Sequence, residues 1–282
     1  MNQRKSLKEL NLLDKFLFDE AMDDPENVKT MLDIILSQNT NLKHPPQTEK
    51  EQRTATDNRQ IRLDVYAIDE DDVIYEVEAQ KENTHNLPKR SRLYQGIIDS
   101  KLLPPGVVDF NLLNEVLIVM ITPFDLFGYG LYRYTFQMRC EEVPELKLDD
   151  GATRIFLNTR GKHPELVSSE LIELLKYMEH STDEVSEACE SKRIQEMHRR
   201  VCQIRASEKT EVKYMQSWEE RIMIKQEGIA EGRIEGEKAL LKSLIEKKMV
   251  KKYSAEQISA MLEVDVSEVE NIMKEIQNEK YL

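Results

Sequence analysis

The sequence predicts an α/β domain with a mixed central sheet flanked by helices, followed by an all-α tail. Three observations predict this fold class: two stretches that alternate with period two, at 61–68 and 73–80, a continuously apolar stretch at 115–122, and charged, helix-favouring sequence beyond Thr182. Period-two alternation is typical of strands with one buried face, and a continuous apolar run is typical of a strand buried on both faces. With 282 residues and 40% hydrophobic content, the chain can bury a full core.

The elements follow one another in an order that suits such a domain. Apolar residues recur at helical spacing in residues 7–38, so we expect two helices there, the second opened by Pro25. Residues 39–58 are polar and are expected to form a connection without strands. The acidic turn at 69–72 joins the two alternating stretches into a β-hairpin. The remaining expected elements are a helix at 87–103, the buried strand at 115–122, strands at 131–139 and 153–158, and a helix at 164–178.

The second half of the chain divides into a charged helical linker at 181–236 and a small helix-turn-helix-like tail at 237–282, after a first domain at 1–180. Gly228, Gly232 and Gly236 lie on one helix stripe, which fits either a close approach of two helices or a frayed linker. Ser254 followed by Gln257 forms a capping box that predicts the start of a tail helix. Small helical tails of this kind also mediate dimerisation, so we expect a homo-oligomer formed through the C-terminal helices.

The composition limits which functions and which kinds of metal site are expected. A net charge of −13 argues against coating nucleic acid by charge alone, because nonspecific DNA binding needs Lys and Arg to neutralise phosphates. The three cysteines have no CxxC spacing and no two of the five histidines are four residues apart, so we expect reduced thiols and a metal held by oxygen ligands. No apolar run is long enough for a membrane span and no cleavable leader is evident, so we expect a cytoplasmic protein.

The polar face of the hairpin carries the candidate active site. For the apolar faces of the two strands to coincide, paired residue numbers must sum to an even number, and a three-residue loop places Asp64 opposite Glu78. Directly opposed residues have Cβ atoms about 5 Å apart, so two carboxylates at these positions repel each other and need a counter-ion. Mg²⁺ prefers such oxygen ligands, with Mn²⁺ as a substitute, so we expect Asp64 and Glu78 to hold the metal. Gln80 points to the same face and can orient a water molecule. The alternative is an ordinary solvent-exposed polar face.

The helix after the hairpin carries candidate substrate-binding residues, namely Arg90, Arg92, Tyr94 and Gln95. One exposed side of this helix can face a phosphate backbone. The alternative is an amphipathic helix that packs Leu93, Ile97 and Ile98 while its arginines pair with acids. Asp14, near the N-terminus, is a further candidate acid.

Several motifs together resemble the recombination-promoting nuclease family, which are PD-(D/E)XK nuclease-fold, transposase-like proteins. The resemblance rests on the D-x13-E-x-Q spacing of Asp64, Glu78 and Gln80, on L-L-D-K-F-L-F at 12–18, on N-L-P-K-R-S-R-L-Y-Q-G-I-I-D at 86–99, on T-P-F-D-L-F-G-Y-G-L-Y-R-Y-T-F at 122–136 and on R-I-F-L-N-T-R-G at 154–161. It spans about the first 180 residues. The acidic tail punctuated by Glu-Gly is also similar to the family.

The resemblance implies a PD-(D/E)XK, restriction-endonuclease-like core and Mg²⁺-dependent cleavage of DNA near recombination or mobile-DNA processing. By matching position, Asp64, Glu78 and Gln80 take the catalytic roles. The chain departs from the general motif by having Leu63 before the first acid and Gln80 in place of lysine. Because glutamine supplies no positive charge, a catalytically weak or inactive DNA- or protein-binding module is the alternative. A transcription regulator built on the terminal helices is a third, weaker hypothesis, because its last helix is acidic.

Overall fold

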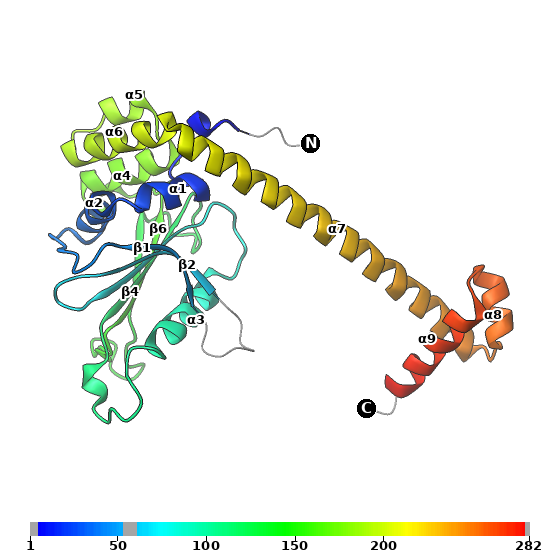
Figure 1. The fold of residues 1–282 in the computed structure, drawn as a ribbon. Coiled ribbons are helices and arrows are strands. Elements are labelled where there is room, and N and C mark those ends of the chain that lie inside the picture. The colour runs from blue at the N-terminus through cyan, green and yellow to red at the C-terminus, as the bar shows by residue number, and fades with distance from the viewer. Residues whose placement is uncertain (1–4, 53–60, 280–282) are drawn as a thin grey trace. The chain divides into compact units, whose positions relative to one another are not determined.

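The computed structural model of the chain describes residues 5–52 and 61–279 (Figure 1). Strands and helices are mixed in the first part of the chain, and the second part is helical. In chain order the elements are η1 (Leu7–Glu9), α1 (Lys15–Met22), α2 (Pro25–Leu36), β1 (Gln47–Gln52), β2 (Ile61–Ile68), β3 (Ile74–Ala79), α3 (Leu87–Asp99), η2 (Phe110–Leu112), β4 (Val116–Thr122), β5 (Arg133–Phe136), β6 (Ala152–Asn158), η3 (Pro164–Leu166), α4 (Ser169–Glu179), α5 (Asp183–Glu187), α6 (Lys192–Ala206), α7 (Glu208–Val250), α8 (Ala255–Leu262) and α9 (Val266–Glu279).

The six strands form one mixed sheet in the order β1-β2-β3-β4-β6-β5. The first three strands are antiparallel neighbours, β4 runs parallel to both β3 and β6, and β5 is antiparallel to β6 at the far edge. A parallel connection needs a crossover, and α3 supplies it between β3 and β4. The predicted mixed α/β architecture with a helical C-terminal region is therefore confirmed.

Helices cover both faces of the sheet. One core cluster joins the apolar side chains of α1, α2, α4 and α6 to Val65, Val77 and Val119 of the sheet. A second cluster joins α3 to Ile118 and Met120 on the other face. In Figure 1 the first group of helices lies on one side of the strands and α3 lies on the other. Successive residues of β4 thus enter opposite clusters, which explains the continuous apolar run that predicted a doubly buried strand.

The predicted register of the hairpin is confirmed from Val65 to Ile68, whereas the predicted pairing of Asp64 with Glu78 lies outside the observed ladder. Val65 pairs with Val77, and Ile68 pairs with Ile74, so the paired numbers have an even sum. The loop between them is closed by a hydrogen bond from the Asp69 N–H to the Val73 carbonyl. Leu63 differs from the prediction, because it packs in the second cluster and not with Val65 in the first. The β2–β3 ladder ends at Val65, so the alternation of faces does not extend to Leu63.

The polar connection expected at 39–58 contains β1, which the sequence analysis missed; residues 53–58 lie outside the described part of the chain. β1 carries no apolar side chain, so period-two alternation of hydrophobicity is absent from it. The strand forms through backbone pairing with β2, from Gln47 opposite Tyr66 to Gln52 opposite Ile61. Charged residues are typical of an edge strand, where they discourage pairing with other chains.

The first compact unit extends further than the predicted domain at 1–180. It comprises residues 1–214, and the second unit comprises residues 215–282. The difference arises at α6, where Ile194, Met197 and Val201 are fully buried in the first core cluster. The charged residues of α6 dominate its composition and concealed this apolar stripe, so the segment was assigned to a linker.

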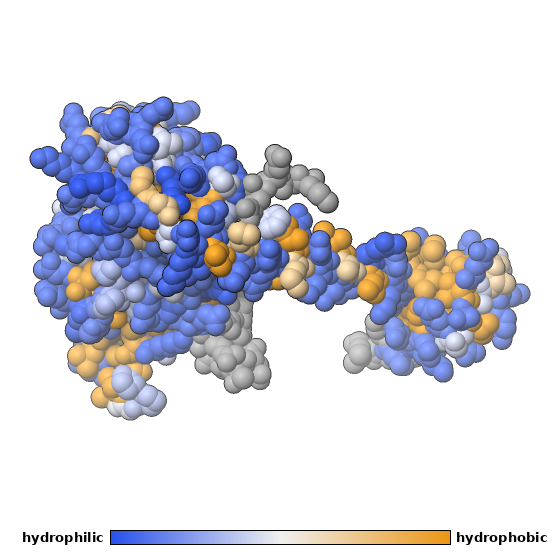
Figure 2. Space-filling model, turned by 45° about the horizontal axis from the view of Figure 1, so that its top comes forward, coloured by the Kyte–Doolittle hydropathy of each residue, from blue (hydrophilic) through white to orange (hydrophobic). Residues whose placement is uncertain are grey.

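The second unit contains most of α7 together with α8 and α9. Ile245, Ile258, Val269 and Ile276 form its small core, and hydrophobic atoms gather over these helices in Figure 2. The predicted capping box is present, because the Ser254 hydroxyl accepts from the Gln257 N–H and the Gln257 side chain accepts from the Ser254 N–H. Among the described residues, none of the helices combines the length and apolar character needed to cross a membrane.

The glycine stripe lies within continuous helix. α7 runs unbroken through Gly228, Gly232 and Gly236, and no described atom lies within 4 Å of a Cβ built at any of them. The frayed-linker interpretation is therefore wrong for this segment. Close approach by another helix is sterically open along the stripe.

Candidate active site

Two buried carboxylates meet where the β2–β3 ladder ends. Asp64 on β2 is 5% exposed and Glu78 on β3 is 6% exposed. The two carboxylates lie close enough for the charge of Asp64 to raise the pKa of Glu78. Carboxylates are rarely this buried without partners. The exposed polar face that stood as the alternative for the hairpin is therefore wrong.

Cations from both flanking layers reach these acids. Lys15, in the first turn of α1, places its Nζ 2.5 Å from Asp64 Oδ1. Arg90, in the first turn of α3, forms an ion pair with Glu78 through one guanidinium nitrogen, which also lies 2.9 Å from Gln80 Oε1. The two helices thus bring one positive charge to each acid from opposite faces of the sheet.

Burial dominates the electrostatics of the cluster. The pKa of Glu78 is raised to about 7. Loss of hydration is the largest cause and the Asp64 carboxylate adds to it, while Arg90 opposes both effects. Burial also raises the pKa of Asp64, although the Lys15 ammonium opposes the rise. Burial alone would lower the pKa of Lys15, but attraction to Asp64 and Asp19 outweighs it, so its pKa is raised. The cations therefore offset only part of the cost of burying the acids.

Glu76 is a third acid on the same strand face, two residues before Glu78. It is 0% exposed, and neither of its carboxylate oxygens has a hydrogen-bond partner among the described residues. Burial and the neighbouring charges of Glu78 and Asp64 raise its pKa well above the ordinary value. An ionised carboxylate that is buried without a partner destabilises the fold. Glu76 is therefore compatible with the fold only when it is protonated or when an additional cation lies beside it.

The predicted site residues separate into two groups. Arg90 contacts the acid cluster, and its guanidinium lies 5.7 Å from the ring centre of Tyr94, so these two residues and Gln80 belong together. Gln80 also donates from its amide nitrogen to the Glu82 carbonyl at 2.7 Å. Arg92 is exposed elsewhere on α3, and Gln95 donates to Asp99 at 2.9 Å. The structure does not bring these last two to the acids.

The amphipathic alternative for the helix holds in part. Arg90 does pair with an acid, and Ile97 and Ile98 are buried as that interpretation expected. Leu93, in contrast, is 41% exposed. It lies beside Arg90 and Lys89 at a surface hollow of about 400 Å³. One side of the helix thus packs and the other borders a basic hollow.

Asp14 lies at the rim of the site and not within it. Its carboxylate forms an ion pair with Lys81 at 2.5 Å and accepts from the Asn11 N–H at 2.9 Å. It is also the N-cap residue of α1, immediately before Lys15. The Asp14 side chain makes no capping hydrogen bond to α1, and its ion pair with Lys81 ties the start of this helix to the segment after Gln80.

The sequence analysis missed Lys15, Asp19 and Glu76 as site residues. Glu76 had a usable signal, because it shares the period-two face of Glu78 and Gln80. Lys15 and Asp19 had none, since Lys15 lies 49 residues before Asp64 and only the packing of α1 brings them together. Burial raises the pKa of Asp19 to about 7, against the opposing attraction of Lys15.

The acid cluster fits a divalent metal ion. Glu78 Oε2 is buried and has no hydrogen-bond partner among the residues the structure describes, and it neighbours a second carboxylate of raised pKa. Oxygen donors of this type are the ligands of Mg²⁺ and Mn²⁺. Asp64 and Glu78 are therefore the residues that would hold such an ion. Glu76 is close enough to both for their charges to raise its pKa.

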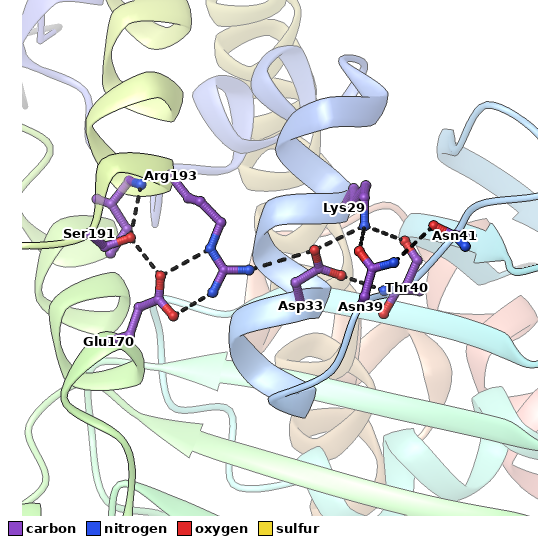
Figure 3. Close-up of polar contacts among 9 residues, drawn as sticks. Lys29, Asp33, Asn39, Thr40, Asn41, Glu170, Ser191 and Arg193 are labelled. Atoms are coloured by element: carbon purple, nitrogen blue, oxygen red, sulfur yellow. Dashed lines mark hydrogen bonds and ion pairs between the residues drawn. The ribbon is translucent and has the colours of Figure 1, made fainter.

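A second polar network lies between α2, α4 and α6 (Figure 3). Arg193 reaches between the two acids of this network, at 2.5 Å from Glu170 and 3.6 Å from Asp33. Asp33 also accepts from Lys29 at 3.0 Å and from the Thr40 N–H at 2.6 Å. Each charge here faces an opposite charge, so this network fastens three helices and differs from the acid cluster, where carboxylate oxygens lack partners.

Comparison of the chain with protein-family models, with curated proteins and with solved structures finds no match.

Proposed function

We propose that the chain is a cytoplasmic, Mg²⁺-dependent DNA endonuclease with a PD-(D/E)XK-like core, acting near recombination or mobile-DNA processing. The observation that carries the proposal is the buried pair of Asp64 and Glu78, whose charges are incompletely offset by the protein. The order of helix, antiparallel strands, crossover helix and parallel strand supports it, because the resemblance of the sequence implies a central sheet of this kind with the acids on its hairpin.

The residues of the site take distinct roles in phosphodiester hydrolysis. The ion held by Asp64 and Glu78 would polarise the scissile phosphate and lower the pKa of a bound water. Lys15 provides the positive charge that Gln80 lacks. Because Lys15 lies beside Asp64, its ammonium group would be next to the scissile phosphate, on which negative charge develops during hydrolysis. The Gln80 carbonyl oxygen holds Arg90 in place, and Gln80 can orient the attacking water through its amide.

A basic hollow next to Glu78 supports DNA as the substrate. It has a volume of about 400 Å³ and is lined by Arg62, Lys89 and Arg90. Arg62 is paired with Glu49 and Glu51, and Arg90 is paired with Glu78, so a phosphate would meet Lys89 directly and the two guanidinium groups in competition with these acids. Guanidinium and ammonium groups are the usual partners of phosphate oxygens. A local basic surface of this kind lets a chain with a net charge of −13 approach a phosphate backbone.

The test is cleavage of plasmid DNA by the purified chain, with and without Mg²⁺ or Mn²⁺. We expect metal-dependent nicking that Asp64→Ala and Glu78→Ala each abolish. Asp71→Ala is the matched control, because Asp71 is an exposed acid in the loop of the same hairpin. Cleavage that survives both variants, or that needs no divalent metal, would refute the assignment.

A binding module without catalysis is the second candidate. It is favoured by the ion pairs that Lys15 and Arg90 make with the two acids, since these pairs already neutralise part of the charge that a metal would neutralise. On this hypothesis the wild type does not cut DNA with any divalent metal, and Mg²⁺ does not raise its melting temperature.

We also propose that the second unit mediates self-association. Hydrophobic atoms recur along α7 in Figure 2. Seven apolar side chains of this helix are more than half exposed, namely Val212, Met223, Ile224, Ile229, Ile234, Leu240 and Val250. Burying such a side chain contributes about 1.5–3 kcal/mol. A second copy of the chain can cover them, and the glycine stripe allows close helix packing.

A further inference from the structure

A cluster of three different metal-ligating side chains lies away from the acid cluster, at the junction of α5 and α6. Asp183, His198 and Cys202 each present one ligand atom, and these three atoms lie within 4.8 Å of one another. His198 Nε2 is the shared point, at 2.8 Å from Asp183 Oδ1 and 3.4 Å from Cys202 Sγ. We propose that these residues form a binding site for a Zn²⁺-type transition metal ion that clamps α5 to α6.

The hydrogen-bonding capacity of the imidazole does not account for this convergence. Nε2 carries at most one proton, and the Asp183 carboxylate at 2.8 Å is placed to accept it. A nitrogen that donates to Asp183 cannot accept from the Cys202 thiol, 3.4 Å away, and can offer its sulfur only a weak share of the same N–H. Three atoms with lone pairs gathered around one point are arranged as a ligand set, and carboxylate, imidazole and thiolate are the ligands that zinc takes in proteins.

The two ligands on α6 are preorganised by helix geometry. His198 and Cys202 are four residues apart, so their side chains lie one above the other on one face of the helix. The lack of two histidines at this spacing argued against a histidine-based metal site in the sequence. The mixed pair of His198 and Cys202 has the same geometry and adds a softer donor.

The His198 ring is held in the orientation that a metal ligand requires. Its other nitrogen, Nδ1, lies 2.9 Å from the hydroxyl of Tyr177, a residue on α4 that is fully buried. The two rings meet edge to face with their centres 5.5 Å apart. Metal-bound histidines commonly have such a partner on the second nitrogen, which fixes the ring and its tautomer. A hydroxyl can donate or accept, so Tyr177 suits either tautomer.

The distances need only small adjustments to accept an ion. Ordinary Zn–N, Zn–O and Zn–S bond lengths at tetrahedral angles separate nitrogen from oxygen by about 3.4 Å and nitrogen from sulfur by about 3.6 Å. The present separations are 2.8 Å and 3.4 Å. To reach the first separation the Asp183 oxygen has to move by roughly half an ångström. The third separation, between this oxygen and Cys202 Sγ, is at most 4.8 Å. The Asp183 side chain is 82% exposed and can make this movement, and this exposure leaves the fourth position of the ion open to water.

The experiment is a titration of the reduced, metal-free full-length chain with Co²⁺, which takes the geometry of Zn²⁺ and reports its ligands by absorption. We expect a near-ultraviolet thiolate-to-cobalt band and intense visible bands of tetrahedral cobalt, which saturate at one thiolate-bound ion per chain and are lost on adding Zn²⁺. Cys202→Ser should remove the thiolate band, and His198→Gln should weaken the visible bands. Tyr177→Phe should weaken Co²⁺ binding by about 10- to 100-fold.

Cys140→Ser is the matched control, because Cys140 is a half-buried free thiol far along the chain from this cluster. It should leave both bands unchanged. Circular dichroism of Cys202→Ser checks that the variant is folded, so that loss of the band reports loss of a ligand. A wild type without a thiolate band at saturating Co²⁺ overturns the proposal, and so does a band that persists in Cys202→Ser or disappears in Cys140→Ser.

Discussion

Replacing Glu78 by glutamine tests whether the acid cluster is destabilising until a cation reaches it. Burial and the charge of Asp64 raise the pKa of Glu78 from 4.5 to about 7 in the folded chain. Between these two values the folded state binds more protons than the unfolded state, so the free energy of unfolding falls as the pH rises. The full difference corresponds to about 3 kcal/mol at pH 8. Glutamine has nearly the same shape, keeps an oxygen for Arg90, and does not ionise.

We therefore expect Glu78→Gln to be more stable than the wild type by up to about 3 kcal/mol at pH 8 and by about 1 kcal/mol or less at pH 5. For a unit of this size the difference at pH 8 corresponds to an increase in melting temperature of roughly 6–12 °C. Thermal unfolding followed by circular dichroism in metal-free buffer at both pH values measures it. The variant should also lose all DNA cleavage.

Asp71→Asn is the control for a general effect of removing one negative charge, since Asp71 lies exposed in the same hairpin. Its stability relative to the wild type should be the same at both pH values. Mg²⁺ at pH 8 should stabilise the wild type and not Glu78→Gln, because the variant lacks one metal ligand. An unchanged difference between pH 5 and pH 8, or a variant less stable than the wild type at pH 8, refutes the reasoning.

Three further predictions concern separate parts of the chain. Gln80→Ala should reduce the cleavage rate by about 10- to 1000-fold, whereas Gln80→Lys should stay active; equal rates for both variants and the wild type would remove Gln80 from the mechanism. Lys15→Met should lower the rate by about 10- to 100-fold, while Lys43→Met, which removes a similarly exposed ion-paired lysine, should not; equal losses would contradict a role for Lys15. A chain that ends after Tyr214 should have the mass of a monomer by light scattering, and an unchanged mass would exclude self-association through the second unit.

The sequence determined those features that depend on local pattern. Alternation with period two located β2 and β3, and the even sum required by coincident apolar faces set the register of their ladder from Val65 opposite Val77 to Ile68 opposite Ile74. The apolar run located β4 between two layers, and a capping box marked the start of α8. These features need only residues that are close in sequence or that share one hairpin.

Tertiary structure decided everything that depends on residues far apart in the chain. β1 has no hydrophobic pattern, and only backbone pairing with β2 makes it a strand. Lys15 reaches Asp64 because α1 packs against the sheet, and Tyr177 reaches His198 because α4 packs against α6. The alternation of β3 shows that Glu76 shares a face with Glu78, but it does not show that Glu76 is completely buried. Side-chain periodicity shows which residues share a face, whereas burial and partners depend on what the rest of the chain brings to that face.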